Sequence, residues 1–370
     1  MNIRSKAERS FVLLDGVRGL GAIMVLMGHT ITSWGLPMPQ SGNIVVDAFF
    51  LMSGFVLAYA YEPRFAAGMS AGEFMLQRLI RLFPLYLLGT IGVYVIVIAI
   101  TVGDANAGDR VSLYTIRLIP QLFMLPSPEF LHTKDMYSLN TPAYTLFFEL
   151  VVNLVYVLIF RWLTMRVLIG LVVVLGVILT FTVFHFGFLG VGSDWATWWG
   201  GFPRAGFGFF VGVLAYRIAG SPKTADRPVS WFAIPMLLLL PLVCFIPASA
   251  EMRPFIDLTL AFALFLPLLL LGQSIRPPEM LTRACLVAGQ ISYAVYILQQ
   301  PIREIYERID WKSTFLTDTA PAGGIVALVV VLAISIAAEK YYDRPVRRAL
   351  TKLFGPRPKV AAEQPSVAAP

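Results

Sequence analysis

The sequence has little charge and few residues of the kinds that bind metals. Charged residues make up 14% of the 370 positions, about half the share in average soluble domains, whereas hydrophobic residues make up 57%. The chain has three histidines and two cysteines, and the cysteines, Cys244 and Cys285, lack the spacing of metal ligands. P-loop, HExxH, CxxC and GxSxG motifs are also absent. These absences argue against a soluble domain, a phosphate-driven pump and a zinc protease, and we expect no metal site.

Long apolar runs dominate the chain instead. A bilayer is crossed by about twenty apolar residues in an α-helix, and ten runs approach or reach that length. They cover residues 11–34, 43–61, 82–102, 142–160, 167–186, 202–216, 231–247, 255–272, 286–300 and 323–338. The sequence therefore predicts an all-α integral membrane protein with about ten transmembrane helices.

The basic residues lie mainly in short loops, and they set the expected orientation. With a cytoplasmic N-terminus, alternation places 20 of the 29 Lys and Arg residues on the cytoplasmic side and seven on the outer side. Both termini are then cytoplasmic, and the net charge of +7 fits contact with membrane lipids rather than with nucleic acid. We expect a multi-pass protein of a bacterial-type inner (plasma) membrane.

This topology divides the chain into three parts. Residues 1–10 form a cytoplasmic N-terminus and residues 11–348 the transmembrane domain. Arg18 interrupts the first apolar run and no small-residue cleavage site follows, so we interpret this run as an uncleaved span. Residues 349–370 form a cytoplasmic tail, rich in Pro and Ala, that we expect to be disordered. In the longest outer segment, residues 114–125 predict a short interfacial or re-entrant helix.

The first span carries three ionisable residues, which are costly inside a membrane and therefore mark a functional site. Arg18 and His29 are eleven residues apart, so on a helix they face the same way, roughly 16 Å apart along the axis. Asp15 precedes Arg18 by three residues and can neutralise it. The alternative is that Asp15 and Arg18 anchor one end of the helix at the headgroups and His29 the other end.

Further polar residues occur at a similar depth on other spans. Asp47, Glu149, Arg204 and Gln299 all fall in the outer half of the bilayer in the expected topology, as does His29. Such groups should face an interior cavity, where Asp47 or Glu149 could orient the imidazole of His29 as a general base. The alternative is that these residues form helix–helix hydrogen bonds that hold the bundle together.

A second polar group lies at the cytoplasmic start of the third span, in RLIRLFPLY. Arg78 and Arg81 share a helix face and could hold a phosphate or diphosphate, with Tyr86 close by. An anchor at the cytoplasmic membrane surface would account for the same two arginines.

Six segments, taken in order, resemble motifs of the membrane-bound acyltransferase 3 family. Arg18 and His29 match the Arg, ten residues, His signature of that family, and Ser53 lies in VDAFFLMSGFVL, which is similar to its FFxLSGFV segment. The family's RxxRxxPxY segment is matched by RLIRLFPLY, and Glu149 stands in a helix similar to its fourth-span motif. Two later helices, PRAGFGFFVGVLAY and GQISYAVYILQQP, also resemble family segments. The similarity covers about residues 10–348.

The resemblance implies a stand-alone O-acyltransferase without a soluble hydrolase-like domain. It would move an acyl group from cytoplasmic acyl-CoA to a hydroxyl of a cell-surface or secreted glycan. We expect this group to be acetyl rather than succinyl or a longer chain. Acyl-CoA would be a co-substrate, with no bound cofactor. His29 would be the base or the acyl carrier, with Glu149 or Asp47 beside it. The residues implied to bind donor or acceptor are Asp15, Arg18, Ser53, Arg78, Arg81, Tyr86, Arg204 and Gln299.

Two other functions fit the same residues. A transporter of a sugar, a lipid-linked intermediate or another solute would also carry charged residues at mid-depth, although two related halves are not evident in the sequence. A scaffold protein of a glycan-assembly complex would tolerate the loss of His29.

Many relatives have His where this chain has Gln299, which leaves His29 as the titratable base at that level.

Overall fold

The computed structural model describes residues 11–37, 39, 41–101, 107–131, 133–220, 228–313 and 318–355. Within these ranges the chain is helical, with two isolated β-bridges and no extended sheet. The all-α prediction is confirmed. The predicted N-terminal segment and most of the predicted tail lie outside the described residues. The first residues of that tail were expected to be disordered, but residues 349–354 continue a helix.

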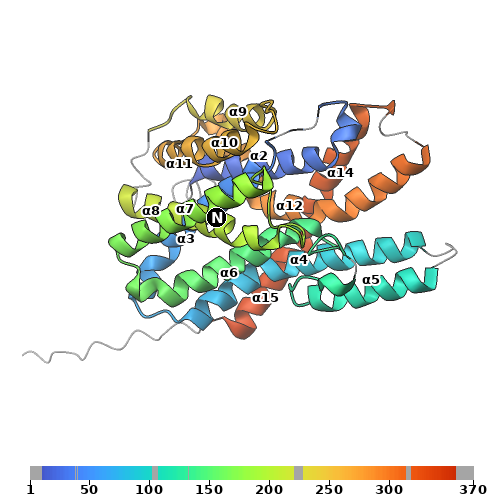
Figure 1. Cartoon of the computed structure of the whole chain (residues 1–370), viewed down its shortest axis with the longest axis horizontal. Helices are drawn as coiled ribbons and strands as arrows, with labels where there is room; N and C mark the ends of the chain where they lie inside the picture. The colour runs from blue at the N-terminus through green and yellow to red at the C-terminus, as the bar shows by residue number, and fades with distance from the viewer. Residues whose placement is uncertain are drawn as a thin grey trace, which may run out of the picture.

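The helices lie roughly side by side along the long axis of the molecule, with α9, α10 and α11 together on one side and α4 and α5 along the opposite edge (Figure 1). In chain order they are α2 (Val12–His29), α3 (Ile44–Ala66), α4 (Ala71–Thr101), α5 (Ala107–Gln121), α6 (Tyr144–Ile159), α7 (Met165–Phe186), α8 (Gly201–Ala219), α9 (Ala233–Cys244), α10 (Arg253–Leu258), α11 (Phe265–Gly272), α12 (Glu279–Ser313), α14 (Ala322–Ala338) and α15 (Arg344–Phe354). Two π-helical turns, η7 (Thr259–Leu264) and η8 (Glu339–Asp343), join α10 to α11 and α14 to α15.

Eight segments of the described chain are helical, long and apolar enough to cross a membrane. They are Val12–His29, Ile44–Ala66, Ala71–Thr101, Thr141–Trp162, Met165–Phe186, Arg253–Gly272, Glu279–Glu307 and Ala322–Phe354. The other two predicted runs correspond to α8 and to α9, which has only 12 residues. Each apolar run therefore falls on a helix, whereas the number of ten spans and the side of the termini stay predictions.

Small residues bring α3 and α8 into close contact at the centre of the bundle. A Cβ atom at Gly54 would lie 1.9 Å from the carbonyl oxygen of Phe209, and one at Gly212 would lie 2.1 Å from that of Leu51. Neither position therefore has room for a side chain. Close backbone approach through glycine is a common way to pack helices where the surrounding lipid is as apolar as the side chains.

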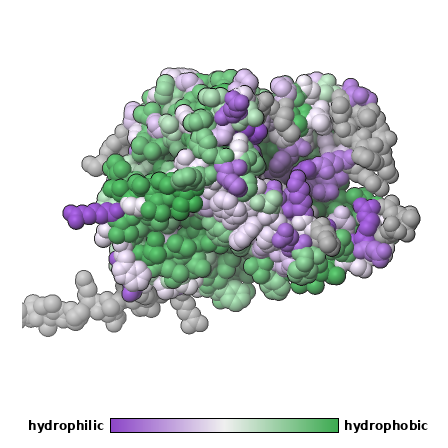
Figure 2. Space-filling view, viewed as in Figure 1, coloured by the Kyte–Doolittle hydropathy of each residue, from purple (hydrophilic) through white to green (hydrophobic). Residues whose placement is uncertain are grey.

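The surface of the bundle is largely apolar. Figure 2 shows hydrophobic residues over the left and centre of the molecule and hydrophilic residues gathered toward the right. On α7, Val173, Val174, Val177 and Phe181 are exposed. A band of this kind is expected for a surface that faces lipid acyl chains.

The predicted interfacial or re-entrant helix is present as α5, which begins earlier than expected. It packs along the second half of α4, where Tyr94 and Thr115 are joined by a hydrogen bond of 2.9 Å between their hydroxyl groups. Among its residues only Gln121 is buried. With its polar face exposed and its other face against α4, α5 forms a helical hairpin with α4.

Candidate active site

A cavity of about 410 Å³ lies among α2, α3, α4, α6 and α12. Its walls are mostly apolar, and its polar side chains come from all five helices: Asp15, Arg18, Ser53, Arg78, Arg81, Thr145, Glu149, Ser292, Tyr293 and Tyr296. Six of the residues predicted to act in the site therefore share one cavity. Cavities of this size, apolar with a few convergent polar groups, are typical binding sites.

Arg18 is held by three hydrogen bonds at the α2–α12 contact. Its guanidinium donates to Asp15 Oδ1 at 3.0 Å, to the Gly289 carbonyl at 2.7 Å and to Ser292 Oγ at 2.9 Å. The expected pairing of Arg18 with Asp15 is confirmed. The pair places a fixed and largely neutralised cation in the cavity wall.

Glu149 forms a second ion pair across the cavity. Its Oε1 atom accepts from Arg78 Nη2 at 2.5 Å and from Ser53 Oγ at 2.7 Å, which joins α6 to α4 and α3. Both charged side chains are mostly buried, at 13% and 18% exposed. Arg78 therefore already has a carboxylate partner, and the predicted binding of a phosphate by Arg78 and Arg81 stays a prediction.

Arg81 is the cation in this cavity that has no acidic partner in contact. It is partly buried and lines the cavity, and the structure gives it no hydrogen bond or ion pair within the described residues. Its electrostatic neighbours are three other arginines, Arg347, Arg18 and Arg78, together with Asp343. Because Arg18 and Arg78 are each paired, Arg81 leaves the cavity with an excess positive charge that favours an anionic ligand.

His29 lies at the outer end of α2 in the expected topology and does not line this cavity. It is exposed, the side chain of Gln299 is within reach of it, and Arg303 is close enough to act on it electrostatically. The Oε1 atom of Gln299 is buried and has no hydrogen-bond partner in the described part of the chain. The expected contact of His29 with Asp47 or Glu149 is not found among the described residues.

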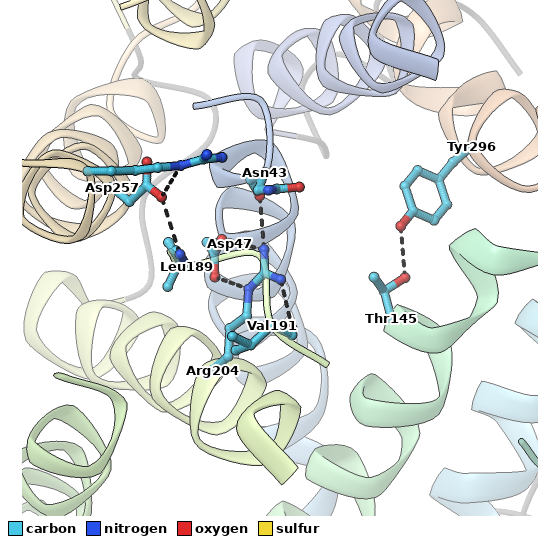
Figure 3. A network of polar contacts seen from close by, with 9 residues as sticks. Asn43, Asp47, Thr145, Leu189, Val191, Arg204, Asp257 and Tyr296 are labelled. Carbon is cyan, nitrogen blue, oxygen red and sulfur yellow. Dashed lines mark hydrogen bonds and ion pairs between the residues drawn. The ribbon is translucent and has the colours of Figure 1, made fainter. Parts of the chain in front are cut away.

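An apolar cluster separates His29 from the cavity. On α2, between Arg18 and His29, Ala22 and Leu26 pack with Val295 and Tyr296 of α12. Tyr296 also makes an edge contact with Phe49 at a ring distance of 5.8 Å. Its hydroxyl is hydrogen-bonded to that of Thr145 on α6 at 3.0 Å, and Figure 3 shows the two side chains pointing toward each other. Phe49, Thr145 and Tyr296 thus close the end of the cavity that faces His29; we call these three residues the partition.

Asp47 and Arg204 form a buried ion pair outside the cavity (Figure 3). Arg204 donates to both carboxylate oxygens of Asp47, at 2.9 and 2.7 Å, and to the carbonyls of Asn43 and Val191. The two side chains are 0% and 1% exposed. This geometry fits the alternative in which they cross-link α3, α8 and the segment before α8, and neither contacts His29 in the described structure.

Tyr86 also lies away from the cavity. It is fully buried, and its hydroxyl donates to the carbonyl of Gln121 at 2.5 Å. Gln121 in turn donates to Ser127 Oγ at 2.6 Å. Tyr86 therefore holds the end of α5 against α4 and does not line the cavity, and its predicted contact with the donor stays a prediction.

The sequence reasoning did not single out four cavity residues, namely Thr145, Ser292, Tyr293 and Tyr296. Each lies in a motif that carries the family resemblance, PAYTLFFEL or GQISYAVYILQQP. The available signal was helical spacing: Ser292 and Tyr296 share a face of α12 with Gln299, at steps of four and three residues. No group of three or more His, Cys, Asp or Glu residues in the described ranges could hold a metal ion.

Similarity to known proteins covers most of the chain. The family described as an acyltransferase domain matches residues 11–340. A curated protein of Rhizobium radiobacter, "Protein 2 in picA locus", is 36% identical over 167 residues, which cover 43% of this chain and 85% of that protein. No solved structure matches the chain. The match over most of the chain and the eight candidate spans favour an enzyme over the transporter and the scaffold. The chain belongs to the acyltransferase 3 family and is a multi-pass membrane acyltransferase.

Proposed function

We propose that the protein transfers an acyl group, with acetyl as the expected group, from cytoplasmic acyl-CoA to a hydroxyl of a glycan or related acceptor on the outer side. The donor would enter the cavity from its cytoplasmic end, and His29 would act near the acceptor. We place the protein in the inner (plasma) membrane of a bacterial-type cell. The observation that carries the proposal is the guanidinium of Arg81, which has no acidic partner in contact within the described residues, in a cavity whose other charges are paired and whose walls are mostly apolar.

The charge of the cavity supports an anionic donor. A cation withdrawn from water is stabilised by an opposite charge, and Arg81 has no such partner in contact within the described chain. A phosphate of acyl-CoA would supply it. The apolar walls, which include Val46, Phe50 and Leu146, fit the flexible arm that carries the thioester.

His29 is the proposed base or acyl carrier. As a base, it would take the proton of the acceptor hydroxyl while the oxygen attacks the thioester carbonyl. The new C–O bond forms, the C–S bond breaks, and the CoA thiolate recovers a proton. As a carrier, its ring nitrogen would first take the acyl group, with release of CoA, and then pass it to the hydroxyl. Either route requires the partition to move, because it separates the imidazole from the cavity.

The test uses purified protein in nanodiscs with acetyl-CoA and candidate glycans. We expect the wild type to release free CoA and to acetylate a glycan, as detected by mass spectrometry. His29→Ala should abolish transfer while its thermal unfolding stays close to that of the wild type. The matched control is His185→Ala, which removes an exposed imidazole at the end of α7 and should retain activity. Normal turnover by His29→Ala would refute the assignment of the base.

A further inference from the structure

The helix α15 carries a concentrated positive charge next to the cavity. Its eleven residues, RPVRRALTKLF, include four basic residues and no acidic one. Arg344, Arg347, Arg348 and Lys352 line one shallow hollow together with Thr351. The helix continues the α14 span through the π-helical turn η8, and it packs against α4 (Figure 1).

Two of these cations are neutralised and two are not. Arg344 pairs with Glu339 at 2.5 Å, and Arg347 pairs with Asp343 at 2.8 Å. Arg348 and Lys352 are exposed, and within the described chain neither has a hydrogen bond or an ion pair. They are four residues apart and therefore present their charges on one face of the helix.

The basic face of α15 is connected to the cavity through buried groups. Asp343 is 1% exposed, and besides its ion pair with Arg347 it interacts electrostatically with Arg81. Arg347 and Arg81 are themselves close enough to repel each other. Tyr293, a cavity residue, is an electrostatic neighbour of both Arg81 and Asp343. Arg81 at the cavity is thus linked to the basic helix α15 through Asp343 and Arg347, which neutralise each other.

We propose that α15 binds the nucleotide phosphates of the acyl-CoA donor; this rests on the proposed function. Acyl-CoA carries a 3′-phosphate and a diphosphate at the end remote from its thioester. With that end on Arg348 and Lys352, the connecting arm passes Arg81 and brings the thioester into the apolar cavity. Charge-assisted hydrogen bonds of this kind are strong, and they give α15 a role that a positive membrane anchor lacks.

The double variant Arg348→Gln/Lys352→Gln separates this site from the rest of the donor-binding region. For acetyl-CoA we expect KM to rise about tenfold with kcat nearly unchanged, since two phosphate contacts are lost. For 3′-dephospho-acetyl-CoA the increase should be smaller, and for acetyl-pantetheine, which lacks the nucleotide, KM should not change. The control is Arg161→Gln/Arg166→Gln, which removes two exposed charges next to α7 and should leave all three KM values unchanged.

Three results would overturn the proposal: an unchanged KM for acetyl-CoA, an equal increase for acetyl-pantetheine, or an increase seen only in anionic nanodiscs and lost in neutral ones. The last result would assign α15 to lipid phosphates. Binding of adenosine 3′,5′-bisphosphate is measured alongside. If the wild type turns over no thioester, the proposed function fails. The proposed site is then judged by nucleotide binding alone: saturable binding that the wild type shows and the double variant loses supports the site. A wild type without saturable binding refutes the site.

Discussion

At the scale of single residues, the site is defined by which charges are paired. Arg18 and Arg78 are each matched by a carboxylate, Asp15 and Glu149, and among the described residues that line the cavity Arg81 is the cation left to attract an anion. The paired arginines hold neighbouring helices in place, whereas an arginine without an opposite charge makes the cavity selective for anionic ligands. The electrostatic preference of the cavity therefore depends mainly on one side chain.

Arg81→Gln should weaken donor binding first. We expect KM for acetyl-CoA to rise about tenfold or more, because a charge-assisted contact is lost, with a smaller change in kcat. Arg81→Lys should recover part of the loss by keeping the charge. The measurement is CoA release at a series of donor concentrations. Arg283→Gln is the control, since it removes an exposed charge at the start of α12. An equal effect of the two Gln variants would remove Arg81 from the site.

The sequence predicted some of these pairs and not others. Asp15 and Arg18 are three residues apart, so helical spacing alone brings them together. Arg78 and Glu149 are 71 residues apart, and nothing in the sequence indicates the direction in which each helix turns its side chain. Depth in the membrane placed Glu149 on the level of His29 and Arg78 at the cytoplasmic start of its span, but their ion pair of 2.5 Å shows that the two groups meet at one level.

At the scale of helices, the partition depends on the contact between α6 and α12, which under the proposed function separates the donor from His29. Thr145 and Tyr296 join these helices through a hydrogen bond of 3.0 Å between their hydroxyl groups. Tyr296 also donates to the carbonyl of Pro142 at 3.3 Å, and Phe49 of α3 packs against the tyrosine ring. A single neutral hydrogen bond contributes about 1 kcal/mol, which is small enough to break during turnover. The partition can therefore open without unfolding of the bundle.

Thr145→Val and Tyr296→Phe should each favour the open partition. Loss of about 1 kcal/mol corresponds to about a fivefold shift in the opening equilibrium, so we expect acetyl-CoA hydrolysis without acceptor to rise several-fold. The double variant should show no more than Tyr296→Phe alone, because that change already removes the Thr145–Tyr296 bond and the bond from Tyr296 to the Pro142 carbonyl. Tyr94→Phe is the matched control, since it breaks the Tyr94–Thr115 pair at α5. Additive effects would contradict the shared bond.

Helix positions followed from hydropathy, because runs of apolar residues must be buried or face lipid. Helix contacts did not follow. The approach of α3 to α8 depends on Gly54 and Gly212. From the sequence alone, a glycine in an apolar run indicates either a close helix–helix contact or a residue that weakens the helix. The two π-helical turns, η7 and η8, likewise have no sequence signal that we recognised.

At the scale of the whole molecule, the Asp47–Arg204 pair joins the helices on one side of the cavity. Arg204 also binds the carbonyls of Asn43 and Val191, so one side chain fixes two helices and the segment that precedes α8 (Figure 3). Removing one partner of such a fully buried ion pair lowers the free energy of unfolding by much more than the intact pair contributes to it. Its main effect is to hold the bundle in one arrangement.

Arg204→Met should destabilise the protein by about 3–5 kcal/mol, because Asp47 is left charged and buried. The double variant Asp47→Leu/Arg204→Met should regain most of that stability and retain acyl transfer. Thermal unfolding in detergent and CoA release are measured together. A double variant that unfolds like the wild type but transfers no acyl group would return Asp47 or Arg204 to the chemistry.

The closed partition also insulates the membrane. A passage that ran from one face to the other would let protons and small ions follow their gradients at every encounter with a substrate, and the cell would lose stored energy continuously. Under the proposed function, Phe49, Thr145 and Tyr296 stop the cavity short of His29, so only the acyl group would cross and the two aqueous compartments would stay electrically separate during transfer.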